Sequence, residues 1–253
     1  MHRFFVGKSQ VQDRIATITG EDAKHLEKVL RLNTGDIIEV VVGEEQEYLG
    51  EIIAMEKKSH HVQLLEFRSL PRESPLKITL YQGLPKASKM ELIIQKAVEL
   101  GVWRIVPVMN QRSVVQLKTK KDQHKKQERW QKIAYEAAKQ SKRIIIPEIT
   151  EPVEFNRAIH SSAEEVQIVA YEEEKKDGLR VLPLADRNEK TKRSLRSIGL
   201  WVGPEGGFTE DEVEDLKRIG AKAVTLGPRV LRTETAGLAM LTMVQYERGD
   251  LGG

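Results

Sequence analysis

The chain of 253 residues contains no cysteine, and only 5% of its residues are aromatic. Without cysteine there is no disulfide, no thiolate nucleophile and no zinc site with cysteine ligands. This absence is typical of a reducing compartment, and we expect a cytoplasmic protein. No apolar run reaches the length of a membrane-spanning helix, and the first residues lack the apolar core of a signal peptide. The sequence therefore predicts no contact with a membrane.

Several motifs that mark well-known active sites are also missing. There is no His-Glu-x-x-His, and the six histidines do not form a metal-spaced cluster, so we expect no metal. The hydrolase motif Gly-x-Ser-x-Gly is absent. Neither a Gly-x-Gly-x-x-Gly fingerprint nor a P-loop occurs, which disfavours a nucleotide-dependent dehydrogenase or kinase.

Positive charge is concentrated in two segments, although the net charge is only +3. Residues 118–143 hold ten Lys or Arg against three acids, whereas residues 1–70 are slightly acidic. Such segments are expected where a protein meets phosphates, and equally on a solvated helix face. The second basic run consists of Arg187, Lys190, Lys192, Arg193 and Arg196.

The chain divides at a proline-containing linker, residues 70–75. Before the linker, short strands rich in Val and Ile surround one helix, expected over 21–30, which favours a small β-barrel over βαβ units. These strands are expected at 3–6, 14–19, 36–42, 47–55 and 61–67. We therefore expect a β-barrel domain over residues 1–71 and a second domain over 76–253.

In the second domain strands alternate with helices, which predicts an α/β fold whose parallel sheet is covered on both faces. We expect strands at 77–81, 103–109, 165–171, 200–202 and 223–226, and helices at 88–100, 120–141, 152–160, 209–219 and 233–247. Residues 172–196 form a polar, charged insertion.

The last of these helices is apolar around nearly its whole circumference. A helix of this kind is buried on all sides, so we expect a homodimer that covers it, with a core helix inside one chain as the alternative. Its apolar residues are Ala236, Leu238, Ala239, Met240, Leu241, Met243 and Val244.

Two glycine-bearing loops follow two of the C-terminal strands, at the edge where parallel α/β sheets bind ligands. The glycines at 203, 206, 207 and 227 permit close approach of a ligand to the backbone. Between Gly203 and Asp215 there are six acids and no base. The first loop is therefore a poor anion cradle and fits a neutral or cationic ligand better. A plain structural turn is the alternative.

An arginine, two hydroxyls and a carboxylate meet at the start of the last helix, in Arg232-Thr233-Glu234-Thr235. Two of these residues have a simple structural explanation: Thr233 would cap the last helix, and Glu234 would interact favourably with the positive end of the helix dipole. Arg232 has none, because a cation is electrostatically disfavoured there. Arg232 is therefore the strongest candidate for a chemical role.

The two loops together closely resemble the RsmE family of 16S rRNA (uracil-N3)-methyltransferases, in the SPOUT superfamily. They read Gly-Pro-Glu-Gly-Gly-Phe over 203–208 and Leu-Gly-Pro-Arg-Val-Leu-Arg-Thr-Glu-Thr-Ala over 226–236. The resemblance continues in segments 25–32, 35–36, 96–102, 111–113 and 136–143.

This resemblance implies a PUA-like β-barrel that helps to grip RNA, followed by a SPOUT α/β domain with a C-terminal trefoil knot. It implies a homodimer that binds S-adenosylmethionine and methylates N3 of one uridine in 16S rRNA of the assembled small ribosomal subunit. The implied cofactor-binding residues are Gly203, Pro204, Glu205, Gly206, Leu226, Gly227, Leu231 and Thr233.

The chemistry of this reaction assigns further roles as a hypothesis. Uracil N3–H must lose its proton before it attacks, and Arg232 could stabilise the resulting anion, with Glu234 a weaker candidate for the base. The expected RNA contacts are Arg3, His25, Arg31, Arg112 and Arg143. The alternatives are a non-catalytic ribosome-assembly or RNA-binding factor, and a SPOUT methyltransferase acting on another RNA such as tRNA.

Overall fold

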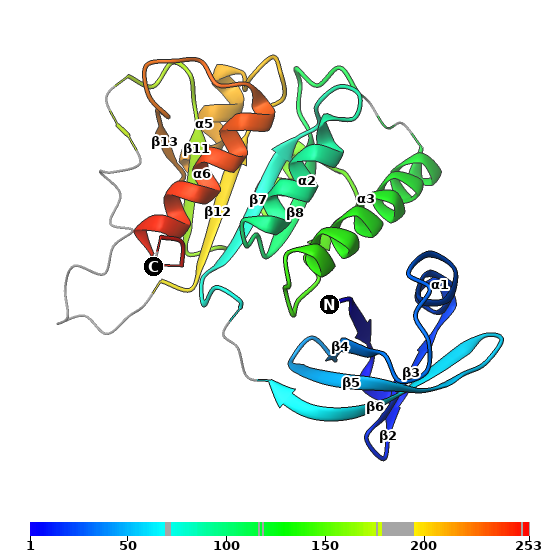
Figure 1. Cartoon of the computed structure of the whole chain (residues 1–253). Helices are drawn as coiled ribbons and strands as arrows, with labels where there is room; N and C mark the ends of the chain where they lie inside the picture. Colours follow the sequence, from blue (N-terminus) through cyan, green and yellow to red (C-terminus); the bar gives the residue numbers. More distant parts are fainter. Residues whose placement is uncertain are drawn as a thin grey trace. The chain divides into compact units, whose positions relative to one another are not determined.

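A computed structural model describes residues 1–68, 72–115, 117, 119–175, 177–178, 195–248 and 250–252. The chain forms two compact units (Figure 1). The first comprises Met1–Glu73 and Ala138–Ile146, and the second comprises Ser74–Ala137 and Pro147–Gly253. Linker residues Leu70 and Pro71 lie outside the described residues, as do Arg187, Lys190, Lys192 and Arg193 of the second basic run. No helix among the described residues is long and apolar enough to cross a membrane.

The first unit is built on a curled sheet of six strands (Figure 1). The order is β1-β4-β5-β6-β3-β2; β1 and β4 are parallel, and the other neighbours are antiparallel. Alternate residues such as Val40 and Val62 point into one apolar core. The strands are β1 (Arg3–Val6), β2 (Val11–Gln12), β3 (Ile15–Thr19), β4 (Ile37–Val42), β5 (Gln46–Met55) and β6 (Ser59–Arg68), with a 3-10 turn η1 (Lys8–Gln10).

The helix predicted over 21–30 changes its winding halfway. It begins as α1 (Gly20–Lys24) and continues as the π-helical turn η2 (His25–Val29), where the Leu30 amide donates to the carbonyl of His25. Arg31 follows with a φ of 54°, in the left-handed region. Neither feature could be predicted from apolar spacing, which does not distinguish α from π winding, and both are common at functional sites.

Buried charges join residues 138–146 to the first unit. The Arg3 guanidinium is 3.0 Å from Glu39 and 2.8 Å from Glu47, and it donates to the carbonyls of Lys142 and Arg143. Lys142 also pairs with Glu39 at 2.8 Å. Removing one partner of such a network would leave an uncompensated buried charge. Residues 138–146 are therefore part of this unit although they follow residues 74–137 of the second unit in the chain.

The second unit contains a parallel sheet, as predicted, with the order β10-β8-β7-β12-β11-β13 and β9 paired to β8. Its strands are β7 (Lys77–Gly83), β8 (Arg104–Met109), β9 (Glu148–Ile149), β10 (Val153–Glu154), β11 (Val166–Ala170), β12 (Ser197–Val202) and β13 (Lys222–Val224). The helices are α2 (Lys89–Glu99), α3 (Lys120–Gln140), whose last residues belong to the first unit, α4 (Phe155–Ser161), α5 (Glu210–Arg218) and α6 (Thr233–Glu247). The helix expected from 152 starts later because residues 153–154 form β10.

Side chains alternate between two apolar layers. On one face Tyr81 stacks on Trp201 of the neighbouring strand, with ring centroids 3.9 Å apart, and Phe155 of α4 packs against the Trp201 ring. On the other face α6 packs against α2, β12 and β7 (Figure 1). The sheet is thus covered on both faces. However, Met243 and Tyr246 of α6 are 40% and 66% exposed, so this chain alone does not bury the helix on all sides.

A buried carboxylate anchors the Tyr81–Trp201 layer. Glu164 accepts hydrogen bonds from the Tyr81 hydroxyl and the Gln167 amide, and it pairs with Arg104 at 3.1 Å. Burial alone would raise the pKa of Glu164, but hydrogen bonds from Thr79, Gln167 and Tyr81 hold that pKa below its usual value. The charged carboxylate is therefore the form that the folded chain stabilises.

Replacing Glu164 with Gln should destabilise the second unit by about 2 kcal/mol at neutral pH, because a charged acceptor is lost. Since the folded pKa is lowered, this stabilisation is present above the unfolded pKa and disappears as pH falls through the folded pKa. The deficit of Glu164→Gln should thus shrink in acid. Urea unfolding followed by tryptophan fluorescence measures it, because Trp103, Trp130 and Trp201 all lie in the second unit. Exposed Glu165→Gln is the control, and a deficit independent of pH would contradict the assignment.

Candidate functional site

A cavity of about 680 Å³ lies beyond the carboxyl ends of β11, β12 and β13. Its volume is within the range of ligand pockets, about 300–1,000 Å³. Residues 170–173, 202–208 and 225–233 form most of its wall, with Lys89, Arg112, Lys175 and Ala236. The wall includes every predicted cofactor-binding residue: Gly203, Pro204, Glu205, Gly206, Leu226, Gly227, Leu231 and Thr233. Arg232 also lines it, whereas Glu234 does not.

The first glycine loop is tightly folded against itself. The Gly207 amide donates to the Pro204 carbonyl at 2.9 Å, and Gly207 has a φ of 67°. A Cβ added at Gly203 would lie 2.9 Å from the carbonyl carbon of Gly207. Side chains at these positions would therefore strain or clash, and the backbone itself forms this part of the cavity wall.

Arg112 holds the same loop from the side. Its Nη1 donates to the carbonyls of Gly206 at 3.0 Å and Phe208 at 3.2 Å. A Cβ on Gly206 would come within 3.0 Å of the Arg112 Cβ. We predicted Arg112 as an RNA contact, but its guanidinium is engaged by loop carbonyls inside the cavity wall. This geometry favours support of the loop over phosphate binding.

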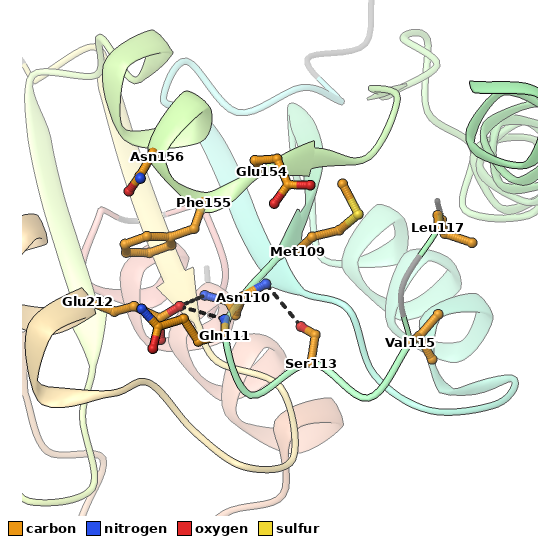
Figure 2. A pocket seen from close by; sticks show the side chains of 10 residues that line it. All are labelled: Met109, Asn110, Gln111, Ser113, Val115, Leu117, Glu154, Phe155, Asn156 and Glu212. Atoms are coloured by element: carbon orange, nitrogen blue, oxygen red, sulfur yellow. Dashed lines mark hydrogen bonds between the residues drawn. The ribbon is translucent and has the colours of Figure 1, made fainter. Parts of the chain in front are cut away.

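Glu212 ties the loop after β8 to the start of α5 (Figure 2). It completes the predicted capping box with Thr209, and its Oε1 accepts from Asn110 Nδ2 at 3.2 Å and the Gln111 amide at 3.0 Å. The loop after β8 also lines a second cavity, of about 360 Å³. Asn110, Gln111 and Ser113 line it, whereas Arg112 lines the larger cavity.

A buried hydroxyl joins the two glycine loops. Thr233 Oγ1 donates to the Gly203 carbonyl at 2.6 Å and accepts from Gln82 Nε2 at 2.8 Å. The expectation that Thr233 caps α6 is wrong: the N-cap is Arg232, without a side-chain cap bond. Gln82 was missed by sequence analysis. A polar residue near the end of the apolar run 78–81 was the available signal.

Arg232 is exposed at the N-terminal end of α6, on the rim of the cavity. Among the described residues, neither its guanidinium nor that of Arg229 in the same loop has a hydrogen-bond or ion-pair partner. The positive end of the α6 dipole adds to their charge. This part of the cavity is suited to an anion or to charge that develops on oxygen.

The wall of the cavity carries more cations than acids. Cavity-lining cations are Lys89, Arg112, Lys175, Arg229 and Arg232, against the acids Glu172, Glu173 and Glu205. The count of six acids was misleading because Glu212 is a buried cap, and Glu214 and Asp215 pair with Lys217 and Arg218 on α5. Sequence spacing does not reveal which of these acidic side chains point into the cavity and which do not.

Glu205 of the cavity wall and Glu234, two residues after Arg232, are both engaged. Glu205 accepts from the Lys86 amide at 3.0 Å and pairs with Lys89 at 3.1 Å. Burial would raise the pKa of Glu205, but these partners hold it below its usual value. Glu234 pairs with Lys89 at 3.2 Å. The carboxylate that we predicted as a weaker candidate for the base is therefore held by Lys89, at the start of α2.

The remaining predicted RNA contacts lie in the first unit. Arg3 and Arg143 are only 2% and 5% exposed. Arg3 belongs to the buried charge network, and Arg143 pairs with Glu73 at 2.6 Å. Buried, paired guanidiniums are not placed to reach RNA phosphates. His25 and Arg31 lie at the exposed π turn and the left-handed residue after it.

Comparisons with known proteins were made with this geometry in hand. Residues 72–245 match an RNA methyltransferase domain, and residues 18–65 match an RNA methyltransferase PUA domain. The chain is 38% identical to the ribosomal RNA small subunit methyltransferase E of Bacillus subtilis, covering 99% of this chain and 100% of that protein. It is 32% identical to the protein of that name from Buchnera aphidicola, covering 92% and 88%.

Two solved structures with bound cofactor are similar along nearly the whole chain. A methyltransferase from Legionella pneumophila, in complex with SAM, is 30% identical with a TM-score of 0.85, covering 96% of each chain. A ribosomal RNA small subunit methyltransferase E from Neisseria gonorrhoeae, bound to S-adenosyl methionine, is 29% identical with a TM-score of 0.81, covering 97% of each chain.

Replacing Thr233 with Val keeps the shape of the side chain but removes the hydroxyl between the loops. The Gly203 carbonyl then loses its donor and Gln82 an acceptor, so the second unit should lose about 1–3 kcal/mol of unfolding free energy. Urea unfolding followed by tryptophan fluorescence measures the change. Thr235→Val, exposed in the same helical turn, is the control and should stay within about 0.5 kcal/mol. Equal effects at both positions would refute the bridging role.

Proposed function

Because the chain belongs to the family of ribosomal RNA small subunit methyltransferase E, we propose that it methylates N3 of a uridine in 16S rRNA of the small ribosomal subunit, with S-adenosylmethionine as methyl donor. The observation that carries the proposal is the cavity that unites both glycine loops with Arg232, whose guanidinium has no partner in the described part of the chain. Such a reaction takes place in the cytoplasm. By the same resemblance, we expect the two loops to form a trefoil knot.

The residues present fit S-adenosylmethionine. The loops at 203–207 and 226–231 would offer it backbone groups rather than side chains. A Cβ at Gly203 would clash with the Gly207 backbone and one at Gly206 would crowd Arg112, so either would disturb the fold of the loop. The wall contains both cationic and acidic side chains, which suits a ligand that carries a sulfonium, an ammonium and a carboxylate group. When bound, the cofactor supplies an electrophilic methyl group on its sulfonium sulfur. We propose that Gly203, Pro204, Glu205, Gly206, Leu226, Gly227, Leu231 and Thr233 hold it.

Arg232 would act on the acceptor base. As N3 loses its proton, negative charge spreads to the two neighbouring uracil carbonyl oxygens. A guanidinium without another partner can donate to these oxygens and stabilise the anion that attacks the methyl group. Stabilisation of this kind is worth on the order of 3 kcal/mol. Transfer is a direct displacement, so it needs no nucleophile from the protein. The N3 proton would pass to solvent water or to Glu234, the weaker candidate for the base.

Methylation of purified small subunits tests the proposal. The protein is incubated with labelled S-adenosylmethionine and small subunits from cells that lack this gene, beside naked 16S rRNA and tRNA, and the digested RNA is analysed by mass spectrometry. One new 3-methyluridine in the subunit sample is expected. Label in tRNA alone would show that tRNA is the substrate instead. If no RNA is labelled and the protein does not bind the cofactor, a non-catalytic assembly factor is favoured.

Replacing Arg232 with Ala should lower the transfer rate by about 100-fold or more, because charge on the uracil oxygens loses its donor. The dissociation constant of S-adenosylmethionine should change only a few-fold, since the cofactor is held by backbone groups. Isothermal titration and single-turnover transfer separate the two effects. Arg218→Ala, on the exposed face of α5, is the control. Near-normal transfer by Arg232→Ala would exclude this role.

We propose that the first unit, with residues 1–71 as its main part, grips RNA through His25 and Arg31. Arg31 is exposed and His25 is partly exposed, so both can approach a phosphate, unlike buried Arg3 and Arg143. Replacing Arg31 with Ala should weaken RNA binding for all sequences and reduce the slope of log affinity against log salt by about 1. Filter binding at several salt concentrations measures the slope, with Lys57→Ala as control. An unchanged slope would remove Arg31 from the RNA surface.

We also propose that the protein is a homodimer in which the outer face of α6 is covered. Met243 and Tyr246 leave an apolar stripe exposed on a helix that is apolar nearly all round. Light scattering tests this by the mass in solution, and a monomer at micromolar concentration would oppose it.

A further inference from the structure

Lys89 contacts two carboxylates that come from the two different glycine loops. Its Nζ is 3.1 Å from Glu205, in the loop after β12, and 3.2 Å from Glu234, in the first turn of α6. Lys89 itself is the first residue of α2 and lines the larger cavity. One ammonium therefore connects three segments that are far apart in the sequence.

The position of Lys89 is not favourable for the helix itself. A cation in the first turn faces the positive end of the helix dipole, so α2 alone gains nothing from it. The hydrogen bond to Glu205, and a weaker one to Glu234, raise the pKa of Lys89, which stays charged at neutral pH. The backbone amide of Lys86, three residues earlier, donates a further hydrogen bond to the Glu205 carboxylate. The turn before α2 thus holds the glycine loop by two groups.

The two loops have one other polar link among the described residues, the buried Thr233–Gly203 hydrogen bond. That bond fixes the loops at their base, whereas the Lys89 pairs lie at the partly exposed rim. Arg232 precedes both links in the chain, directly before Thr233 and two residues before Glu234. Its position over the cavity therefore depends on both.

We propose that Lys89 is a positioning residue for methyl transfer, which holds the Glu205 loop and the start of α6 at a fixed spacing and so places Arg232 relative to the bound cofactor. The inference rests on the proposed function of the cavity. It goes beyond that function by assigning a residue outside both loop motifs. The alternative is that these two contacts are ordinary surface salt bridges, which contribute little to the stability of the fold.

The chain offers a matched control for that alternative. Lys96, on the same helix, pairs with Glu99 at 2.9 Å but does not line the cavity. We would compare Lys89→Gln, Lys89→Arg, Lys96→Gln and the double variant Lys89→Gln with Glu234→Gln. The readouts are the dissociation constant of S-adenosylmethionine, the transfer rate at saturating cofactor, thermal unfolding, and hydrogen exchange of the free protein.

Lys89→Gln should slow transfer and weaken cofactor binding, each by about tenfold, because small displacements of reacting groups have large effects on rate. Amides in 203–208 and 232–236 should exchange faster, while the unfolding temperature changes by less than about 2 °C. Lys89→Arg should recover activity to within about threefold, since a guanidinium can donate to two carboxylates. The double variant should be no worse than Lys89→Gln, because both changes remove the same link.

Normal transfer by Lys89→Gln, or unchanged exchange in both loops, would overturn the inference. Equal impairment of Lys89→Arg and Lys89→Gln would also overturn it, because the ammonium would then act on the ligand directly. So would an equal effect of Lys96→Gln. Failure of the proposed function has a different signature: wild-type protein that transfers no methyl group. In that case the exchange comparison still decides whether Lys89 links the loops.

Discussion

The hydroxyl of Thr233 is the contact on which the cavity depends. It satisfies the Gly203 carbonyl and the buried Gln82 amide together, and it does so from the first residue of α6. Through it the end of β7, the loop after β12 and the start of α6 become one rigid junction. Buried polar groups are costly when unpaired, so the junction has a single low-energy arrangement. The two glycine loops can then present backbone to a ligand, with Arg112 holding the first loop from the side.

The same arrangement explains why Arg232 is available. Helix N-caps are usually Ser, Thr, Asp or Asn, whose side chains satisfy the first free amides. In α6 the threonine follows the N-cap position, and its hydroxyl bonds the Gly203 carbonyl. The helix therefore begins without a side-chain cap. The arginine at the cap position has no partner among the described residues, while Lys89 engages the two carboxylates that could have approached it. Local helix stability is lower than it could be, and the charge faces the cavity.

The sequence predicted much of this and failed in specific ways. Apolar runs and capping residues located nearly every strand and helix, because burial periodicity and local caps are short-range properties. The bounds of α6 were predicted correctly for that reason. Charge counting failed for the first glycine loop, because only Glu205 of the six acids lines the cavity. The other five belong to α5, as a buried cap, as two helix-surface pairs and as two exposed residues of its first turn. Arg3 and Arg112 were predicted as RNA contacts by type, yet their partners, Glu39 and the Gly206 carbonyl, are distant in the chain. Long-range partners of this kind leave no local pattern.

The discontinuity of the first unit affects the order in which the chain can acquire structure during synthesis. Domains commonly fold from the N-terminus as they leave the ribosome. Here Glu39 and Glu73 have emerged long before Lys142 and Arg143, which neutralise them in the finished protein. A nascent chain of residues 1–73 therefore carries burial sites for carboxylates without these counter-charges. The charges of Lys142 and Arg143 reach the first unit only after residues 74–137 of the second unit have also been made.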